Sequence, residues 1–284
     1  MPSLRDIRRR IRSVSNTEKI TKAMELVAAS KLRRAQERTQ NARPYADEVS
    51  GVMAELMRRN PAYEHPYLAV RPVQRRCLIL VTSDRGLVGG LNANSIRLAL
   101  HEINDGGAPV AVVTIGRRGR DSMRRLGKDL IGDVSNYGDR PTLGDVLPAI
   151  RVAMEHYEDG ESDQVDVVYE HFVTTSHQEP TLQRIIPVEP PKDAPPTSAD
   201  FEYEPEARDV LDALLPRYVE AQVYRAVLEN VASEQAARII AMHNASENAG
   251  ELIQGLTLNA NKVRQATITT ELMEVVGGSA GLQS

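Results

Sequence analysis

Hydrophobic and small residues recur at alternating steps of three and four along the last part of the chain. Residues 217–284 contain no proline. The recurring positions fall on one side of a helix and comprise Met242, Ala245, Ala249, Leu252, Leu256, Asn259, Val263, Ala266 and Thr270. This heptad pattern predicts a long helix whose stripe is covered by a partner helix. At about 1.5 Å per residue, the helix would be on the order of 90 Å long, far more than a compact domain of this size needs.

A second amphipathic stripe opens the chain. It comprises Leu4, Ile7, Ile11 and Val14, and it resumes after a step of six residues at Ile20, Met24 and Val27. A step of six instead of seven predicts one slip in register. Ser3 is placed to cap the helix, with Asp6 three residues later. The helical pattern continues to Arg43, is interrupted at Pro44 and resumes to Arg58.

The middle of the chain has a different pattern, in which short apolar, β-branched runs predict strands. The predicted elements are strands at 77–82, 110–115, 165–169 and, more weakly, 182–188, with helices at 94–103 and 142–156. Thr142 and Asp145 form a capping box at the start of the second helix. The alternation of strands and helices predicts an α/β domain with a largely parallel sheet. Six prolines between 187 and 205 predict an extended linker.

The simplest way to cover stripes at opposite ends of the chain is to pair the terminal helices. We therefore predict the α/β class, with a long antiparallel coiled coil of the N- and C-terminal helices attached to a Rossmann-like α/β domain. The predicted parts are an N-terminal coiled-coil helix (1–58), a globular domain (73–188), a Pro-rich linker (189–205) and a C-terminal coiled-coil helix (206–284). The last helix is expected to end at about Val276, because Gly277 and Gly278 follow.

Charge is distributed unevenly along this chain of 284 residues. The formal net charge is −4, yet residues 1–43 carry twelve Lys or Arg and four Asp or Glu. That balance of +8 leaves −12 for the remainder. A basic arm of this kind favours either an anionic partner or a simple solvated helix face. Because its charges are interleaved with an apolar stripe, we expect an ordered helix.

The amino-acid composition indicates how the chain packs and in which compartment it is expected. There is no Trp and only two Phe, which favours helix–helix packing over one bulky core. No stretch approaches twenty consecutive apolar residues, and the first residues lack the apolar region of a secretory signal. The single cysteine, Cys77, cannot form an internal disulfide and fits a reducing compartment, with the cytosol as the default.

The sequence lacks the usual patterns for catalysis and cofactor binding. Gly86, Gly89 and Gly90 follow the first predicted strand but match neither a P-loop nor a dinucleotide-binding fingerprint, so a tight turn is favoured. The six histidines lack metal-ligand spacing, and there is no G-x-S-x-G elbow. We predict no catalytic, cofactor-binding or metal site. The run 262–271 is polar nearly all round, which indicates a helix surface that another molecule covers.

Several blocks of sequence together carry a family resemblance. The blocks are 11–32 (IRSVSNTEKITKAMELVAASKL), 82–92 (TSDRGLVGGLN), 211–218, 232–238, 261–269 and 271–278. They resemble blocks of the gamma subunit of F-type ATP synthase and occur in the expected order along the whole chain. The resemblance implies a noncatalytic rotor that turns inside three alpha and three beta subunits. ATP chemistry on the beta subunits is then coupled to proton flow through a membrane ring.

The resemblance also implies particular contacts and a location. The residues expected to contact the beta-subunit levers and the surrounding collar are Met24, Arg238, Gln265, Thr269 and Glu271. Phe201 and Tyr203 are expected near the membrane ring of c subunits, and the epsilon subunit is a further expected partner. Nucleic acid, cofactors and direct membrane insertion are not expected. The implied location is the cytoplasmic side of the cell inner membrane, as a peripheral protein.

Two departures from the family pattern stand out. Val88 occupies a position where the family commonly has Cys, which argues against an essential thiol there. His243 stands where Lys is common, so one surface charge becomes pH-sensitive or is lost. From the residues alone, two other functions stay open. The basic arm fits a coiled coil that binds nucleic acid, and the α/β domain fits a nucleotide-binding enzyme.

Overall fold

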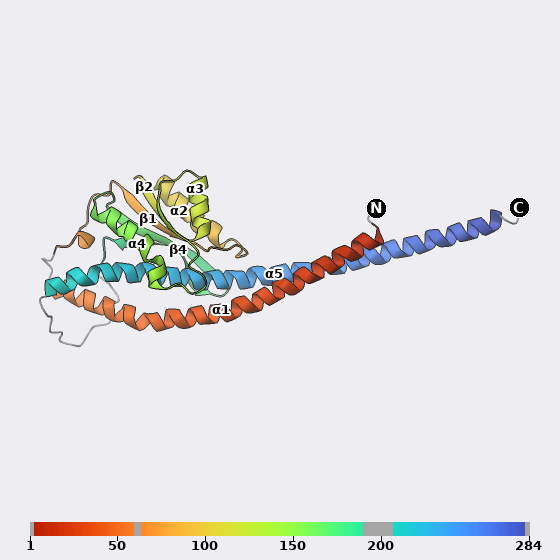
Figure 1. Ribbon diagram of the computed structural model, residues 1–284, viewed down its shortest axis with the longest axis horizontal. Helices are drawn as coiled ribbons and strands as arrows, with labels where there is room; N and C mark the ends of the chain where they lie inside the picture. The colour runs from red at the N-terminus through yellow and green to blue at the C-terminus, as the bar shows by residue number, and fades with distance from the viewer. Residues whose placement is uncertain (1–2, 60–63, 190–206, 282–284) are drawn as a thin grey trace. The chain divides into compact units, whose positions relative to one another are not determined.

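The computed structural model describes residues 3–59, 64–189 and 207–281 (Figure 1). Internal contacts divide the chain into two compact units. The central unit is Ala28–Arg238, and the terminal unit combines the residues up to Val27 with those from Ile239 onward. Two long helices, α1 (Leu4–Arg59) and α5 (Ala207–Gly281), contribute to both units.

The central unit is built on a five-stranded mixed sheet in the order β3-β2-β1-β4-β5. The strands are β1 (Arg76–Val81), β2 (Val110–Ile115), β3 (Leu130–Val134), β4 (Gln164–Thr174) and β5 (His177–Ile186). The first four are parallel, and β5 runs antiparallel to β4. The connecting helices are α2 (Leu91–Asp105), α3 (Arg117–Arg125) and α4 (Leu143–Glu158). Helices α2 and α3 cover one face of the sheet, and α4 covers the other (Figure 1).

This architecture confirms the predicted α/β class and the largely parallel sheet. The four predicted strands correspond to β1, β2, β4 and β5, and the two predicted helices to α2 and α4. The hydrophobic pattern does not reveal β3, because its sequence LIGDV includes a glycine and an aspartate. It does not reveal α3 either, because the sequence RRGRDSMRR has only Gly119 and Met123 to bury.

Helices on both faces explain the composition of the strands. Leu80 and Val112 pack with Ala99 of α2 and Met123 of α3 in one buried cluster. On the other face Ile150 of α4 is fully buried. All six residues of β1 are buried, which is why the five that follow Arg76 form a continuous hydrophobic run without alternation.

Both terminal helices run past the ends predicted for them. Helix α1 is continuous from Leu4 to Arg59, so the predicted interruption at Pro44 is wrong. A proline removes only one hydrogen-bond donor from a helix, and long helices tolerate it with a bend. Helix α5 continues to Gly281 instead of ending at Val276. A glycine costs about 1 kcal/mol relative to alanine in a helix, which weakens the helix without terminating it. The predicted caps at Ser3 and Thr142 are present.

The buried stripe of α1, which we call the α1 seam, keeps one register throughout. Its buried and half-buried positions are Leu4, Ile7, Ile11, Val14, Glu18, Thr21, Glu25, Ala28, Leu32 and Ala35. These steps alternate between three and four without interruption, so the predicted slip is wrong. Ile20 and Val27, which were assigned to the stripe, are 60% and 53% exposed. The error arises because polar side chains occupy three consecutive seam positions, while hydrophobic residues stand beside them.

The stripe of α5, the α5 seam, has the predicted spacing but a different phase. It comprises Met242, Ser246, Ala249, Ile253, Leu256, Ala260 and Val263. Every seventh position agrees with the prediction. Of the intervening ones, Ala245 is half-buried like Ser246, whereas Leu252 and Asn259 give way to Ile253 and Ala260. Leu252 is 52% exposed and Asn259 is also exposed, so neither belongs to the seam. Leu252 and Ile253 are adjacent and similarly hydrophobic, so periodicity alone does not choose between the two phases.

A buried carboxyl group joins β4 to the helices on either side of it. The Ser95 hydroxyl of α2 donates to Glu170 Oε1 at 2.7 Å. The backbone of the same residue is held by α5, because the Glu170 N–H donates to Asn230 Oδ1 and its carbonyl accepts from the Ser233 hydroxyl. Burial raises the pKa of Glu170 to about 7, and the hydrogen bond from Ser95 only partly opposes that shift.

The corrected α1 seam makes a direct prediction. Ile7 is 2% exposed, whereas Ile20 is 60% exposed on the same helix. We expect Ile7→Ala to lower the free energy of unfolding of the helical pair by about 2 kcal/mol or more. Ile20→Ala should change it by less than about 0.5 kcal/mol. Denaturant titrations followed by circular dichroism at 222 nm measure both, and equal losses in the two variants would contradict the register.

Glu170 makes the stability of the central unit depend on pH. Its pKa in the folded chain is about 7, above the ordinary value of 4.5. Between these values the folded chain binds more protons than the unfolded chain, so the free energy of unfolding falls as pH rises. Glu170→Gln, which resembles the protonated acid, should therefore be about 2–3 kcal/mol more stable than the parent at pH 8 and equal to it at pH 4.5. Urea unfolding at the two pH values tests this, and a gain that is independent of pH would refute it.

Candidate functional site

The partner-binding residues expected from the resemblance lie in different surroundings. Met24 is half-buried in α1, and Gln265 and Thr269 are exposed on α5. Phe201 and Tyr203 fall outside the described residues, and so does the side chain of Glu271. The structure thus describes four of the seven expected contact residues, the fourth being Arg238. Their roles as contacts stay predictions.

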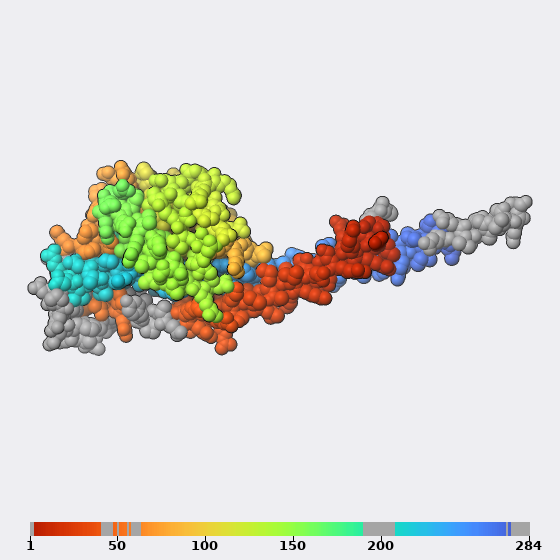
Figure 2. Space-filling view, viewed as in Figure 1, coloured from red at the N-terminus to blue at the C-terminus, as the bar shows by residue number. Residues whose placement is uncertain are grey.

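The exposed end of α5 begins where its seam stops. From Arg264 to Thr270 every residue is exposed. On the face shown in Figure 2, this part of α5 continues beyond the first turns of α1 with no other helix over it. Three threonines in the segment donate their hydroxyl hydrogens to the carbonyl oxygen four residues earlier, at 2.9 to 3.0 Å: Thr267, Thr269 and Thr270. The segment is therefore an ordered helix with an uncovered polar surface.

His243 takes part in an ionic cluster within the terminal unit. Its Nδ1 lies 3.4 Å from Glu25 Oε1, and its Nε2 lies 3.4 Å from Glu247 Oε1. Lys22 donates to the second oxygen of Glu25 at 3.0 Å. The hydrogen bond from Lys22 and the contact with His243 lower the pKa of Glu25. His243 thus faces a carboxylate on each side.

Arg238 is engaged inside its own helix. The side chain is buried, and its guanidinium donates to Glu234 Oε1 at 2.6 Å and to Gln235 Oε1 at 3.1 Å. Burial raises the pKa of Glu234, and the positive charge of Arg238 opposes that shift. A buried ion pair of this kind is costly to break, because the remaining charge has no water around it.

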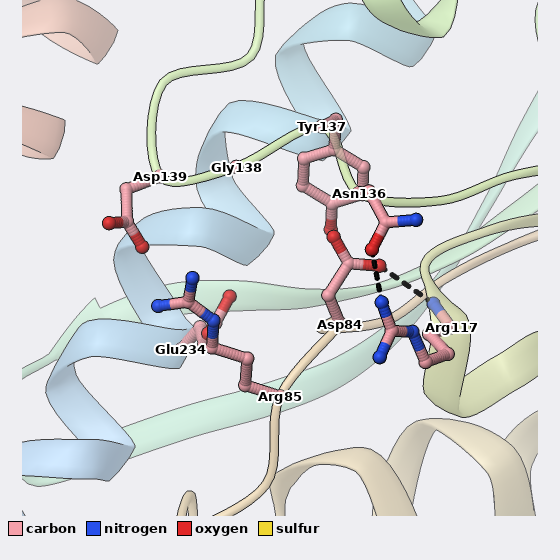
Figure 3. Close-up of a pocket in the computed structure, with 8 residues that line it drawn as sticks. All are labelled: Asp84, Arg85, Arg117, Asn136, Tyr137, Gly138, Asp139 and Glu234. Carbon is pink, nitrogen blue, oxygen red and sulfur yellow. Dashed lines mark hydrogen bonds between the residues drawn. The ribbon is translucent and has the colours of Figure 1, made fainter.

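A pocket of about 170 Å³ opens at the carboxyl ends of the first three strands (Figure 3). It is lined by Asp84, Arg85, Arg117, Asn136, Tyr137, Gly138, Asp139 and Glu234. Six of them come from the loops after β1 and β3, Arg117 is the first residue of α3, and Glu234 comes from α5. This edge of a parallel sheet is where α/β proteins commonly bind ligands.

Most polar groups of this pocket already have partners in the chain. The Arg117 N–H donates to Asp84 at 2.9 Å, and its guanidinium contacts the Asn136 side chain. Lys31 lies 2.7 Å from Asp139. Burial would raise the pKa of Asp139, but the hydrogen bond and charge of Lys31 outweigh it and lower the pKa. The arrangement therefore joins α1 to the strand loops.

The first amides of α3 are likewise used within the chain. The N–H of Arg118 donates to the Ser83 carbonyl, and that of Gly119 donates to Thr82 Oγ1 at 2.8 Å. Gly116 has a φ of 112°, and a Cβ there would stand 2.0 Å from the Thr82 carbonyl oxygen. These contacts leave the start of α3 without the free amides that a phosphate site requires.

Other kinds of site find no support in the part of the chain described. Burial raises the pKa of Cys77 to about 12, so its thiol stays protonated and unreactive. No cluster of three or more histidine, cysteine or acidic side chains within the described ranges is arranged to hold a metal ion. None of the helices, so far as their residues are described, has the apolar length that crossing a bilayer requires.

Comparisons with known proteins agree with the architecture. A family model described as ATP synthase matches residues 3–282. The ATP synthase gamma chain of Herpetosiphon aurantiacus is 49% identical over 293 residues, covering 99% of both chains. That of Acidithiobacillus ferrooxidans is 45% identical over 288 residues, covering 99% of this chain and all of the relative.

Solved structures of ATP synthase central stalks have a similar fold. The central stalk of the mitochondrial ATP synthase of Tetrahymena thermophila matches with a TM-score of 0.62 and 25% identity, covering 80% of this chain and 99% of that one. The rotor of the Euglena gracilis enzyme matches with a TM-score of 0.66 over 93% of this chain and 98% of that one. At 18% identity the second match shows the fold alone.

Two long terminal helices around an α/β domain, together with these matches, define a central-stalk subunit of an ATP synthase. Within that class, the chain belongs to the ATP synthase gamma chain family. The resemblance inferred from the sequence is thereby confirmed, and the chain is a noncatalytic rotor subunit. Neither the nucleic-acid-binding nor the nucleotide-binding alternative is supported.

Substitutions at the ion pair between Arg238 and Glu234 test whether Arg238 stabilises the fold of this chain. We expect Arg238→Met to cost about 3 kcal/mol of unfolding free energy, because Glu234 is then buried without a counter-charge. The double variant E234M/R238M should recover most of that loss. A double-mutant cycle in urea measures the coupling. If the single and double variants are equally destabilised, the pair does not hold this part of α5.

Proposed function

We propose that this chain is the axle of the proton-driven ATP synthase and that the exposed end of α5 is the part the surrounding subunits grip. The observation that carries the proposal is the run 264–270, which is helical and exposed at every position. A polar surface of this length on an ordered helix is well suited to contact with other chains. Gln265 and Thr269 lie on it and would meet the beta-subunit levers in turn as the axle rotates.

The first turns of α1 support the same function through their charge. Five arginines there are exposed, namely Arg5, Arg8, Arg9, Arg10 and Arg12. They would face acidic surfaces of the beta subunits, with Met24 further along the helix beside the same levers. Exposed charges add orientation and speed of association more than affinity. A rotor benefits from this, because each contact must be released at every step.

We further propose the partners at the other end of the axle. Phe201 and Tyr203 would approach the polar loops of the c-subunit ring, and the epsilon subunit would bind the α/β domain. Attachment through the ring and not through a helix of its own would make the chain a peripheral protein on the cytoplasmic side of the inner membrane. The catalytic sites lie on the beta subunits, so this chain contributes geometry and torque.

A matched pair of threonines tests the contact surface of α5. Thr257 and Thr269 are both exposed, and each donates to a carbonyl four residues earlier. Thr257→Ala and Thr269→Ala therefore remove the same intrahelical bond at different positions. We expect the double variant Q265A/T269A to lower ATP hydrolysis by the assembled enzyme about fivefold, which corresponds to about 1 kcal/mol of lost contact.

The control in the same experiment is Q254A/T257A, in which an exposed glutamine and an exposed threonine lie three residues apart on α5, against four in Q265A/T269A. It should leave hydrolysis and coupled proton pumping within about 1.5-fold of the parent, as expected for surface substitutions. Equal effects of the two double variants would show that the end of α5 is no privileged contact surface.

A further inference from the structure

The loop between β3 and α4, residues 135–142, contacts both long helices of the chain. The Lys31 ammonium group of α1 donates to Asp139 Oδ2 at 2.7 Å. The Tyr224 hydroxyl of α5 donates to the Pro141 carbonyl at 3.2 Å. The two acceptors lie close together in one loop, although α1 and α5 come from opposite ends of the sequence. This loop of the α/β domain thus holds both helices, and we call it the clasp loop.

The clasp loop is itself anchored on the α/β domain. Tyr137 is buried, and its hydroxyl donates to the Thr82 carbonyl just after β1 at 2.7 Å. Asn136 and Gly138, on either side of it, have φ values of 66° and 72°. Glycine and asparagine adopt this left-handed conformation most readily, so the sequence favours the turn that leads to Asp139 (Figure 3). The loop ends in the capping box of α4, which fixes its other side.

The contact between Lys31 and Asp139 is charged and partly exposed. The two side chains are 31% and 37% exposed. Burial alone would raise the pKa of Asp139, but the hydrogen bond and charge of Lys31, with the charges of Arg85 and Arg238, lower it. The carboxylate is therefore ionised and faces cations of α1, α5 and the loop after β1. An ion pair this exposed shifts an equilibrium by at most about fivefold, so stability alone gives little reason for it.

The clasp loop adds a link between α1 and a domain to which α5 is already fixed. Helix α5 is aligned on the sheet by the hydrogen bonds of Asn230 and Ser233 with the Glu170 backbone. Both helices continue from the central unit into the terminal unit. If the α/β domain turned while linked to α5 alone, α5 would wind relative to α1. A second link, to α1, makes the two helices turn together.

We propose that the clasp loop couples the rotation of α1 and α5 to that of the α/β domain, with Lys31 and Asp139 as positioning residues. The loop thereby limits how far the two helices twist about each other under load. This inference rests on the proposed function in one respect, which is that torque passes between the α/β domain and the exposed end of α5. It does not depend on which residues of that end the neighbouring subunits grip.

Angular fluctuations of the α/β domain in the assembled ATP synthase test the clasp loop. The enzyme is fixed through its alpha and beta subunits and stalled with a non-hydrolysable ATP analogue. A gold rod is attached through Leu126→Cys, a position that is 50% exposed at the end of α3, in an enzyme whose other reactive cysteines are removed. The variance of the rod angle is inversely proportional to the torsional stiffness of the shaft. The variant K31M/Y224F loses both contacts of the clasp loop, and its variance should rise about 1.5-fold or more.

The matched control is R33M/Y169F. It also removes one cation of α1 and one tyrosine hydroxyl, but Arg33 pairs with Glu37 of its own helix, and the Tyr169 hydroxyl donates to Gln183 within the sheet. The control should keep the variance of the parent, as expected for substitutions away from the clasp loop. An unchanged variance in the test variant, or the same increase in the control, overturns the proposal.

Charge and salt distinguish coupling by this ion pair from a general loosening of the fold. Lys31→Arg keeps the charge and should keep the parental variance, whereas Lys31→Met alone should raise it. Raising the salt from about 50 mM to about 500 mM should increase the variance of the parent more than that of Lys31→Met, because salt screens the pair. Equal responses to salt would refute the role of the pair.

The two proposals fail separately. The hydrolysis defect expected for Q265A/T269A does not require an intact clasp loop, so it should also appear in the background of Lys31→Met. If that defect appears while the angular variance of K31M/Y224F equals that of the parent, the clasp loop is not a coupling element and the proposed function stands. If the variance rises but Q265A/T269A hydrolyses ATP normally, the contact surface of α5 is wrong and the clasp loop stands.

Discussion

The burial of the middle of α5 is the constraint on which the central unit depends. From Ala226 to Arg238 every residue of this helix is buried, although a helix buried on all sides is normally apolar all round. The stretch includes Glu229, Asn230 and Glu234, so each polar group needs a partner within the chain. Most of those partners are the backbone of β4, the ring of His171 and the guanidinium of Arg238. The buried Asn230 Nδ2 and Gln235 Nε2 have no hydrogen-bond partner among the described residues.

This arrangement makes α5 both a core helix and a structural shaft. A helix held only by apolar contacts can shift its register at modest cost, because such contacts are not directional. The Glu170 N–H donates to Asn230 Oδ1 and the Ser233 hydroxyl donates to the Glu170 carbonyl, and these two hydrogen bonds fix both the rotation and the height of α5 against the sheet. Burying these polar groups costs some of the free energy of folding, but their directional hydrogen bonds fix one alignment of α5 against the sheet. A subunit that transmits torque requires such a fixed alignment.

Much of the architecture could be predicted from the sequence, because it follows from periodicity. Hydrophobic steps of three and four revealed α1 and α5, and β-branched runs revealed four of the five strands. The phase of the seams was harder to predict. Glu18, Thr21 and Glu25 occupy seam positions of α1, and hydrophobic periodicity has no means to place polar residues there. The pattern therefore selected Ile20 and Val27, which face outward.

The candidate sites could also be predicted only in part from the sequence. The exposed polar run near the end of α5 was visible in the sequence, because a helix without an apolar stripe needs another molecule to cover it. Individual contact residues such as Gln265 came from family resemblance and from no pattern in the residues themselves. The pocket at the carboxyl ends of the strands could not be predicted, because Asn136 and Asp139 follow β3, a strand that the hydrophobic pattern does not reveal.

The threonines at the end of α5 have a consequence for what can cover them. Thr267, Thr269 and Thr270 each direct the hydroxyl hydrogen inward to a carbonyl oxygen of their own helix. Outward they present a methyl group and an oxygen lone pair, which can accept a hydrogen bond but has no proton left to give. A neighbouring carbonyl therefore finds no directional partner there. A chain that covers this surface would therefore have to supply hydrogen-bond donors or apolar groups, and not acceptors.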